Sequence, residues 1–184
     1  MGSKVSKTTL GKYIQENSTV SRILIIVIVP IFWALIPTHM EAHFPIIAGD
    51  KHHNQTKALP IENIHISKVM YQTLSKSKPE SWISFEGALD NRLDIEIGLP
   101  KLDKLKKFRP TIEIITPKNE SIIIHTSEIN NPEFFHEPYT DTEWWILIRQ
   151  SIKLKSNGIY FIKSFSATKD SGKLWIAVGK DESF

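Results

Sequence analysis

The sequence of 184 residues contains no cysteine. Disulfide bridges, zinc–thiolate sites, iron–sulfur clusters and cysteine nucleophiles are therefore excluded. A domain without such cross-links is stabilised by its apolar core alone, and about 120 residues can bury enough apolar surface for that.

Familiar catalytic signatures are missing as well. The sequence has no G-x-S-x-G elbow, no phosphate-binding glycine loop, no dinucleotide fingerprint and no HExxH motif. Its serines, histidines and aspartates have no spacing that singles out a catalytic triad. The sequence thus predicts no catalytic residue and indicates no cofactor.

The chain has little excess of either charge. The formal net charge is +3, and lysines are interleaved with acidic residues. So weak and dispersed a charge does not indicate nucleic-acid binding. Hydrophobic residues make up 41% and charged residues 23% of the chain, which is typical of a globular protein rather than a disordered one.

One apolar run stands out near the N-terminus. Residues 23–37 carry no charge, and the run extends to about residues 20–40, the length that a helix needs to cross a bilayer. We expect a transmembrane signal-anchor helix at 20–40, after a tail at 1–19. The strictly apolar part also suits a cleaved signal peptide, in which case the remainder is secreted.

Charge around this run predicts its orientation. Lys4, Lys7, Lys12 and Arg22 precede or begin the run, and the next lysine after it is Lys51. Positive residues flanking a membrane span remain in the cytoplasm. We therefore expect a single-pass protein with a cytoplasmic N-terminus and an extracytoplasmic C-terminal domain.

Beyond the run, the pattern changes twice. Residues 41–60 have no sustained period and contain Gly and Pro, so we interpret them as a linker. From residue 61 onward hydrophobic residues alternate, most clearly in 92–99. There Leu93, Ile95, Ile97 and Leu99 share one face of a strand, and Asp94 and Glu96 share the other.

Seven further segments are expected as strands: 63–69, 81–85, 110–117, 121–127, 144–156, 158–167 and 173–180. Asn157-Gly158 and Asp170-Ser171-Gly172 provide turn signals, since Gly adopts positive φ at little cost. Residues 100–110 are expected as a helical turn or an ordered loop, held by Leu102, Leu105 and Phe108. About eight strands without a long helix predict a mainly β fold, an antiparallel β-sandwich or jelly roll at 61–184.

Several stretches carry a family resemblance, namely ISFEG, IGLPKLDKLKKFRPTIEII, HEPYTDTEWW and the closing NGIYFIKSFSATKDSGKLWIAVGKDESF. Together they resemble a poorly characterised family of exported bacterial and archaeal proteins. The closing stretch resembles the end of pre-peptidase C-terminal (PPC-like) β-sandwich domains, with the matching positions Gly158, Tyr160, Gly172, Trp175 and Gly179. The resemblance, over about residues 61–184, implies a jelly-roll-like extracytoplasmic module of the kind that accompanies secreted enzymes or surface proteins.

The candidate ligand site is the stretch 131–145, which concentrates aromatic and acidic residues. Aromatic rings can stack on sugars, and carboxylates can accept hydroxyl hydrogen bonds or hold Ca²⁺. Its candidate residues are Phe134, Phe135, Glu137, Tyr139, Asp141, Glu143, Trp144 and Trp145.

This stretch also has a purely structural interpretation. Adjacent residues of a strand point to opposite faces, so Trp144 and Trp145 cannot both enter one core. One tryptophan then serves the core, while the other is exposed, at an interface or under a loop. A glycosidase would need two of the carboxylates Glu137, Asp141 and Glu143 to flank a cleft, and this hydrolase hypothesis stays open.

Four histidines near the membrane boundary could form a metal site. They are His39, His43, His52 and His53, and neutral imidazole is a good ligand for Zn²⁺ or Cu²⁺. A solvated linker is the competing interpretation. A basic loop, with Lys101, Lys104, Lys106, Lys107 and Arg109, could contact anionic headgroups or remain solvated. The triplets at Asn54 and Asn119 are candidate glycosylation sites on the exported side.

The sequence therefore favours a membrane-tethered extracytoplasmic β-sandwich module with a non-catalytic ligand-binding or structural role at the cell surface. Expected partners are the membrane and a surface glycan or another exported or membrane protein, and no nucleic acid. A small glycan hydrolase using carboxylates in 134–145, and a metal-binding protein using His39–His53, are the alternatives.

Overall fold

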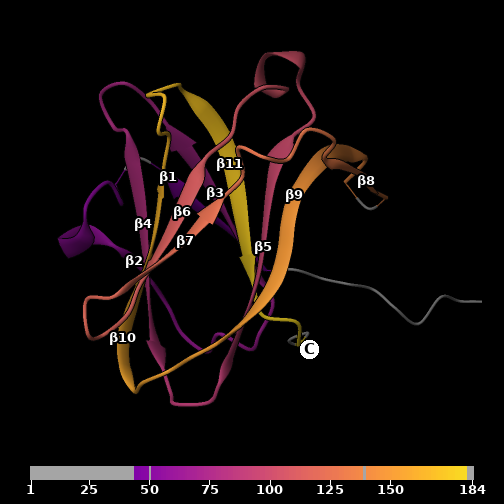
Figure 1. The fold of residues 1–184 in the computed structure, drawn as a ribbon. Helices are drawn as coiled ribbons and strands as arrows, with labels where there is room; N and C mark the ends of the chain where they lie inside the picture. The colour runs from indigo at the N-terminus through magenta and orange to yellow at the C-terminus, as the bar shows by residue number, and fades with distance from the viewer. Residues whose placement is uncertain (1–43, 50, 139, 182–184) are drawn as a thin grey trace, which may run out of the picture. The chain divides into compact units, whose positions relative to one another are not determined.

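The computed structural model describes residues 44–49, 51–138 and 140–181. This part of the chain contains eleven strands and two short 3-10 helices, and no α-helix (Figure 1). The elements are β1 (Phe44–Gly49), η1 (Gln55–Lys57), β2 (Leu59–Ile61), β3 (Lys68–Leu74), β4 (Glu80–Gly87), β5 (Arg92–Pro100), η2 (Asp103–Leu105), β6 (Thr111–Ile115), β7 (Ser121–His125), β8 (Glu133–Glu137), β9 (Thr142–Lys153), β10 (Gly158–Phe165) and β11 (Gly172–Val178).

The strands form two sheets. One sheet has six strands in the order β1-β3-β11-β5-β9-β8, and the other has five in the order β2-β4-β10-β6-β7. The fold is mainly β and sandwich-like, as expected. The expectation of a wholly antiparallel arrangement is wrong, because β1 pairs with β3, and β2 with β4, in parallel.

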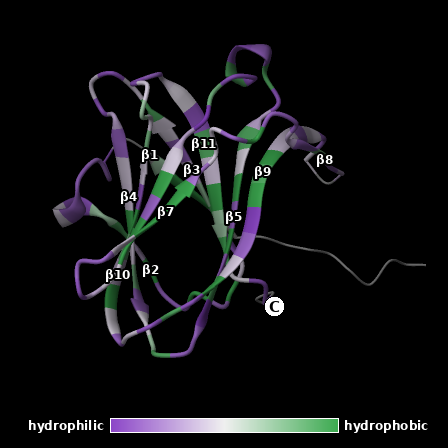
Figure 2. Cartoon of the chain, viewed as in Figure 1, coloured by the Kyte–Doolittle hydropathy of each residue, from purple (hydrophilic) through white to green (hydrophobic). Residues whose placement is uncertain are grey.

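One large core lies between the sheets. It is built by alternate residues of each strand, such as Leu93, Ile95, Ile97 and Leu99 of β5, which are at most 3% exposed. Asp94 and Glu96 are less buried and lie on the other face, so the predicted alternation is confirmed. Figure 2 shows hydrophobic residues concentrated on the strands and hydrophilic ones in many of the connections.

The structure has more strands than the eight expected. Strands β1 and most of β2 fall in residues 41–60, for which the sequence predicts a linker, and each pairs with a strand of a sheet. Their sequences hold Pro45 and Pro60 among apolar residues, a composition compatible with an edge strand. The expected strand at 63–69 begins later, at Lys68, and β8 lies in the candidate ligand stretch.

A bulge breaks the alternation of β9. The pairing with β5 shifts register between Ile97 and Gly98. Ile97 pairs with Ile148 and Gly98 pairs with Ile146, so Leu147 is the extra residue. An extra residue reverses which face the following side chains occupy. Trp145 and Ile148 consequently both pack against the core between the sheets, although they are three residues apart.

Glycines at two expected turns have different roles. Gly158 has a φ of +128°, which a residue with a side chain rarely adopts, as the turn chemistry predicts. Gly172 is instead required for space, since a Cβ there would lie 2.6 Å from the ring of Phe108. Phe108 and Leu105 anchor the η2 connection in the core as expected, whereas Leu102 is 43% exposed.

Within the described residues no helix is long and apolar enough to cross a membrane. The predicted tail at 1–19 and transmembrane helix at 20–40 lie outside the described residues.

Candidate functional site

The candidate ligand stretch folds into a hairpin of β8 and β9. Phe134 pairs with Trp145, and Phe135 pairs with Trp144. Asp141, in the connection between the strands, has a φ of +50°, a left-handed conformation that aspartate tolerates better than most residues. Alternation along this hairpin gives it two sides with different chemistry.

The two adjacent tryptophans lie on opposite faces of the six-stranded sheet, as predicted. Trp145 packs against the core between the sheets. Trp144 packs in a second cluster, on the outer face of the same sheet, with Val69, Ile146 and Trp175. Both tryptophans are partly buried. The chain therefore has apolar packing on both sides of this sheet.

We call the second cluster the outer aromatic cluster. Its rings are those of Tyr71 on β3, Phe135 on β8, Trp144 on β9 and Trp175 on β11. The ring centroids of Tyr71 and Trp144 are 5.8 Å apart, and those of Trp144 and Trp175 are 6.2 Å apart in an edge-to-face arrangement. Aromatic pairs at such distances are stabilising beyond the area that they bury.

These rings come from strands that are not neighbours. In the order β3-β11-β5-β9, two strands separate Tyr71 from Trp144. Their side chains meet because both lean over the middle of the sheet, where Trp175 is largely buried and β5 contributes only Gly98 opposite it. The cluster is thus a tertiary feature built from four strands.

The tyrosine of the cluster lies close to an acidic residue. Burial raises the pKa of the Tyr71 phenol, and the negative charge of Glu137 raises it further. Glu137 is at the end of β8, where alternation places it on the same face as Phe135. An acceptor and a phenol donor therefore accompany the rings on this face.

Ion pairs lie beside the cluster on the same face. Arg149 of β9 contacts Glu96 of β5 at 2.6 Å and Glu133 of β8 at 2.5 Å. Hydrogen bonding to Arg149 lowers the pKa of Glu133, and the same bond raises the pKa of the guanidinium. The outer face therefore combines an aromatic centre with charged hydrogen-bonding groups.

The other side of the hairpin is more exposed. Phe134 is 53% exposed, and the ammonium of Lys101 lies 4.5 Å from the centre of its ring. The same ammonium contacts the Glu143 carboxylate at 3.0 Å. His136 Nε2 lies 2.8 Å from the Asp141 carboxylate. Of the three carboxylates of the hydrolase hypothesis, Glu143 is therefore held in an exposed ion pair and Asp141 in an exposed hydrogen bond.

The predicted ligand residues consequently divide into three groups. Phe135 and Trp144 enter the outer aromatic cluster, with Glu137 near its tyrosine, while Trp145 faces the core. The remainder, Phe134, Asp141 and Glu143, lie on the exposed side or tip of the hairpin, and Tyr139 lies outside the described residues.

Sequence reasoning missed Tyr71 and Trp175 as members of this group. A signal was present in β11, whose residues Leu174 to Val178 form an uninterrupted apolar run. Such a run indicates a strand that is covered on both faces. The strand order decides which aromatic residues of other strands pack on the outer face of β11. This order cannot be read from the sequence pattern.

The histidines are only partly within the described residues. His39 and His43 lie outside them. His52 Nδ1 lies 2.8 Å from the backbone oxygen of Lys57, and His53 has contacts of its own. In the part of the chain that the structure describes, no three His, Asp or Glu side chains are grouped as a metal site.

The two glycosylation triplets have different surroundings. Asn54 caps η1, and its side-chain oxygen accepts hydrogen bonds from Lys57 N–H and the Thr56 hydroxyl. Asn119 is exposed in the connection between β6 and β7, with a φ of +61°.

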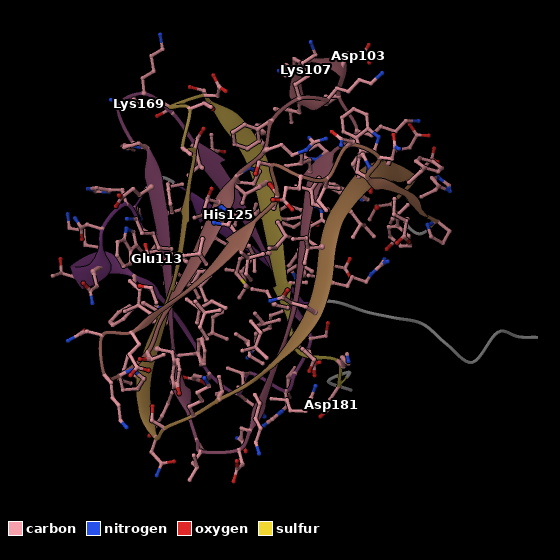
Figure 3. All side chains as sticks on the ribbon, viewed as in Figure 1. Asp103, Lys107, Glu113, His125, Lys169 and Asp181 are labelled. Carbon is pink, nitrogen blue, oxygen red and sulfur yellow. The ribbon has the colours of Figure 1, made fainter. Side chains whose placement is uncertain are left out.

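The basic loop surrounds η2 at one end of the sandwich (Figure 3). Arg109 is used internally, since its guanidinium donates hydrogen bonds to the backbone oxygens of Lys106, Phe108 and Ile129. Burial lowers the pKa of this guanidinium. Lys101 pairs with Glu143, and Arg109 bonds to backbone oxygens. The exposed basic surface of this loop therefore consists of Lys104, Lys106 and Lys107.

A small depression lies at another part of the surface. Its volume is about 120 Å³, and it lies between the β6–β7 connection and the end of β9, with Tyr160 among its lining residues. Pockets that enclose a small ligand measure roughly 300–1,000 Å³. This depression is therefore too small to enclose a sugar ring and its substituents.

Comparisons with known proteins give likenesses to solved structures alone. No protein-family model and no curated protein matches the chain. The chain is similar to the pre-peptidase C-terminal domain of a collagenase from Bacillus anthracis, with 11% identity and a TM-score of 0.41 over 65% of this chain and 91% of that one. At this level of similarity no residue role is transferred.

Proposed function

We propose that this protein is a non-catalytic binding module, held outside the membrane by its N-terminal segment, and that it binds a surface glycan at the outer aromatic cluster. The observation that carries the proposal is the group of Tyr71, Trp144 and Trp175 rings on the outer face of a sheet. Outer faces of sandwich sheets are ordinarily polar. An aromatic group there is the kind of surface on which sugar rings stack.

Polar groups beside the rings support a glycan over an apolar ligand. The Glu137 carboxylate lies near the Tyr71 phenol, and Arg149 with its two carboxylate partners borders the cluster. Sugars present apolar ring faces and a rim of hydroxyls, so they need both kinds of contact. A pocket is not required, because an extended polysaccharide can lie along a sheet.

The membrane part of the proposal rests on the sequence. The apolar segment at 20–40 and the positive residues before it favour a tether with the sandwich outside. Such a tether would keep the module at a high local concentration beside surface polymers.

Binding is tested with the purified full-length chain and a panel of soluble cell-surface polysaccharides, followed by titration calorimetry. Trp144→Ala should weaken binding about tenfold or more, equal to about 1.4 kcal/mol. Trp82→Ala is the matched control, since Trp82 lies on the outer face of the other sheet. Equal loss in both variants, or no binding by the wild-type protein to any polysaccharide, would contradict the glycan proposal.

The tether is tested separately, with single-cysteine variants of this cysteine-free chain. In intact cells a membrane-impermeant maleimide should label Lys104→Cys, in the exposed basic loop, and label Ser3→Cys only after permeabilisation. The reverse pattern would overturn the proposed orientation.

A further inference from the structure

Strand β7 forms one border of the five-stranded sheet, where β6 is its partner (Figure 1). Its sequence is Ser-Ile-Ile-Ile-His. Ile124 is buried in the core, Ile122 packs against that core, and Ile123 on the outer face is 41% exposed. The core-facing side chains therefore hold β7 in place, and its outer face also carries an apolar residue.

The other sheet borders are protected against pairing with a further strand. Pro45 interrupts β1 and Pro60 interrupts β2, and proline cannot donate a ladder hydrogen bond. Strand β8 carries the carboxylates of Glu133 and Glu137, and charge is another common protection of an edge strand. Among the sheet borders of the described residues, β7 is the one with neither proline nor a charged residue such as Lys or Glu.

The free backbone groups of β7 can be assigned from the hairpin geometry. The N–H of Thr116 donates to the oxygen of Glu120 at 2.8 Å, which closes the β6–β7 ladder. Hydrogen-bonded and non-hydrogen-bonded pairs alternate along an antiparallel ladder. The pairs at Ile122 and Ile124 are then hydrogen-bonded to β6, so the N–H and C=O groups of Ser121, Ile123 and His125 point outward.

We propose that β7 pairs in antiparallel orientation with β7 of a second copy of this chain, about a two-fold axis at Ile123. Ser121 then faces His125 of the other copy, Ile122 faces Ile124, and Ile123 faces its counterpart. The outward-pointing residues meet one another, so the Ser121–His125 pair on each side of the axis and the Ile123–Ile123 pair at the axis each exchange two hydrogen bonds, whereas Ile122 and Ile124 form non-hydrogen-bonded pairs. The two five-stranded sheets join into one continuous sheet.

The register follows from the two faces of the sheet. After a slip by one residue, the outward backbone groups of one copy would face groups of the other copy that are already bonded to β6. The same slip would place core-facing isoleucines beside residues of the outer face. A slip by two residues toward the N-terminus would bring Glu120 opposite Ile124. The register centred on Ile123 keeps apolar residues opposite apolar ones and brings no like charges together, as a two-fold interface requires.

Single-cysteine variants test this pairing, because the chain has no cysteine of its own. Across a hydrogen-bonded antiparallel pair, Cα atoms are about 5.5 Å apart, within the span of a disulfide. Ile123→Cys in the purified full-length chain should form a disulfide-linked dimer under mild oxidation. Ser121→Cys should not, since its counterpart would be about 14 Å away at 3.4 Å per residue.

Two further measurements separate specific pairing from chance collision. Ile159→Cys is the matched control, since Ile159 is 50% exposed on the outer face of β10. Ile123→Lys should lower the dimer fraction in sedimentation velocity at least fivefold, because it places two ammonium groups face to face. Equal cross-linking of Ile123→Cys and Ile159→Cys, faster cross-linking of Ser121→Cys, or a dimer fraction unchanged in Ile123→Lys would each overturn the proposal.

Discussion

The indole of Trp175 lies directly against Gly98 of the neighbouring strand. A Cβ atom at Gly98 would be 2.2 Å from Cζ2 of that indole, a distance that no real pair of carbon atoms adopts without bonding. Residue 98 must therefore be glycine for Trp175 to lie flat across the sheet, and the outer aromatic cluster is assembled over that position.

Gly98→Ala should consequently lower the free energy of unfolding by about 1–3 kcal/mol, since overpacking displaces a large ring. Urea unfolding measures the loss, and tryptophan fluorescence reports the displaced indole. In a Trp175→Leu background the smaller side chain leaves room, so the same substitution should cost clearly less. Additive losses in the double variant would mean that the contact with Trp175 is not the cause.

Tyr160 predicts a second stability effect. Its side chain is fully buried, its ring stacks on Phe85 at 5.3 Å, and its hydroxyl donates to Ser156 O and accepts from Ser156 N–H. Tyr160→Phe keeps the stacking but leaves the Ser156 backbone groups without this partner, at a cost of about 1–2 kcal/mol. Thermal and urea unfolding measure it. Ser156→Ala, which removes only a hydroxyl, should cost less; an equal or larger cost would assign the effect to the serine.

Gln72 predicts a stabilising substitution. It is 2% exposed on β3, and neither polar atom of its amide has a hydrogen-bond partner in the described part of the chain. An unpaired buried amide is destabilising, so Gln72→Met, of similar shape, should raise the free energy of unfolding by about 1 kcal/mol. Gln150→Met, at an exposed site, should have almost no effect. A loss of stability in Gln72→Met would show that the amide is paired, for example with buried water.

Asp94 predicts the response to acid. Burial raises the pKa of its carboxyl, but hydrogen bonding to Ser151 and the charge of Lys180 outweigh burial, so the pKa is lowered on balance. The 2.9 Å contact with Lys180 is an ion pair rather than a well-directed hydrogen bond. Because the folded-state pKa is depressed, this contribution is complete above the unfolded value of about 3.9 and is lost as pH falls through the folded value.

Asp94→Asn should therefore flatten the decline of stability below about pH 4, measured by urea unfolding at a series of pH values. Asp90→Asn changes the same charge at an exposed ion pair with Lys153 and serves as the control. An acid limb as steep in Asp94→Asn as in the wild-type protein would contradict this role.

Much of the sandwich could be predicted from local pattern. Strict alternation in β5 needs no tertiary information, because period-two geometry sends Leu93 and Ile95 to one face wherever the strand lies. The same rule predicted that Trp144 and Trp145 separate, and they do. Local pattern failed at β1 and β2, whose short apolar segments are extended only because neighbouring strands pair with them in parallel.

The candidate site could be predicted only in part. The aromatic density of 131–145 indicated the hairpin half of the outer aromatic cluster. Its other half, Tyr71 and Trp175, was hidden because their contact with Trp144 depends on β3 and β11 lying in the same sheet as β9. The distance between two residues along the chain does not indicate whether their strands lie close together in one sheet.

The sequence by itself determined the absence of cysteine chemistry, the alternation of the strands and the opposite directions of two adjacent tryptophans, because these depend on composition and backbone period alone. Only the tertiary structure decided the strand order, the bulge at Leu147 and the meeting of Tyr71, Trp144 and Trp175 over Gly98. The physical reason is that pairing between distant strands depends on how the whole core packs, and a local pattern is compatible with many such pairings.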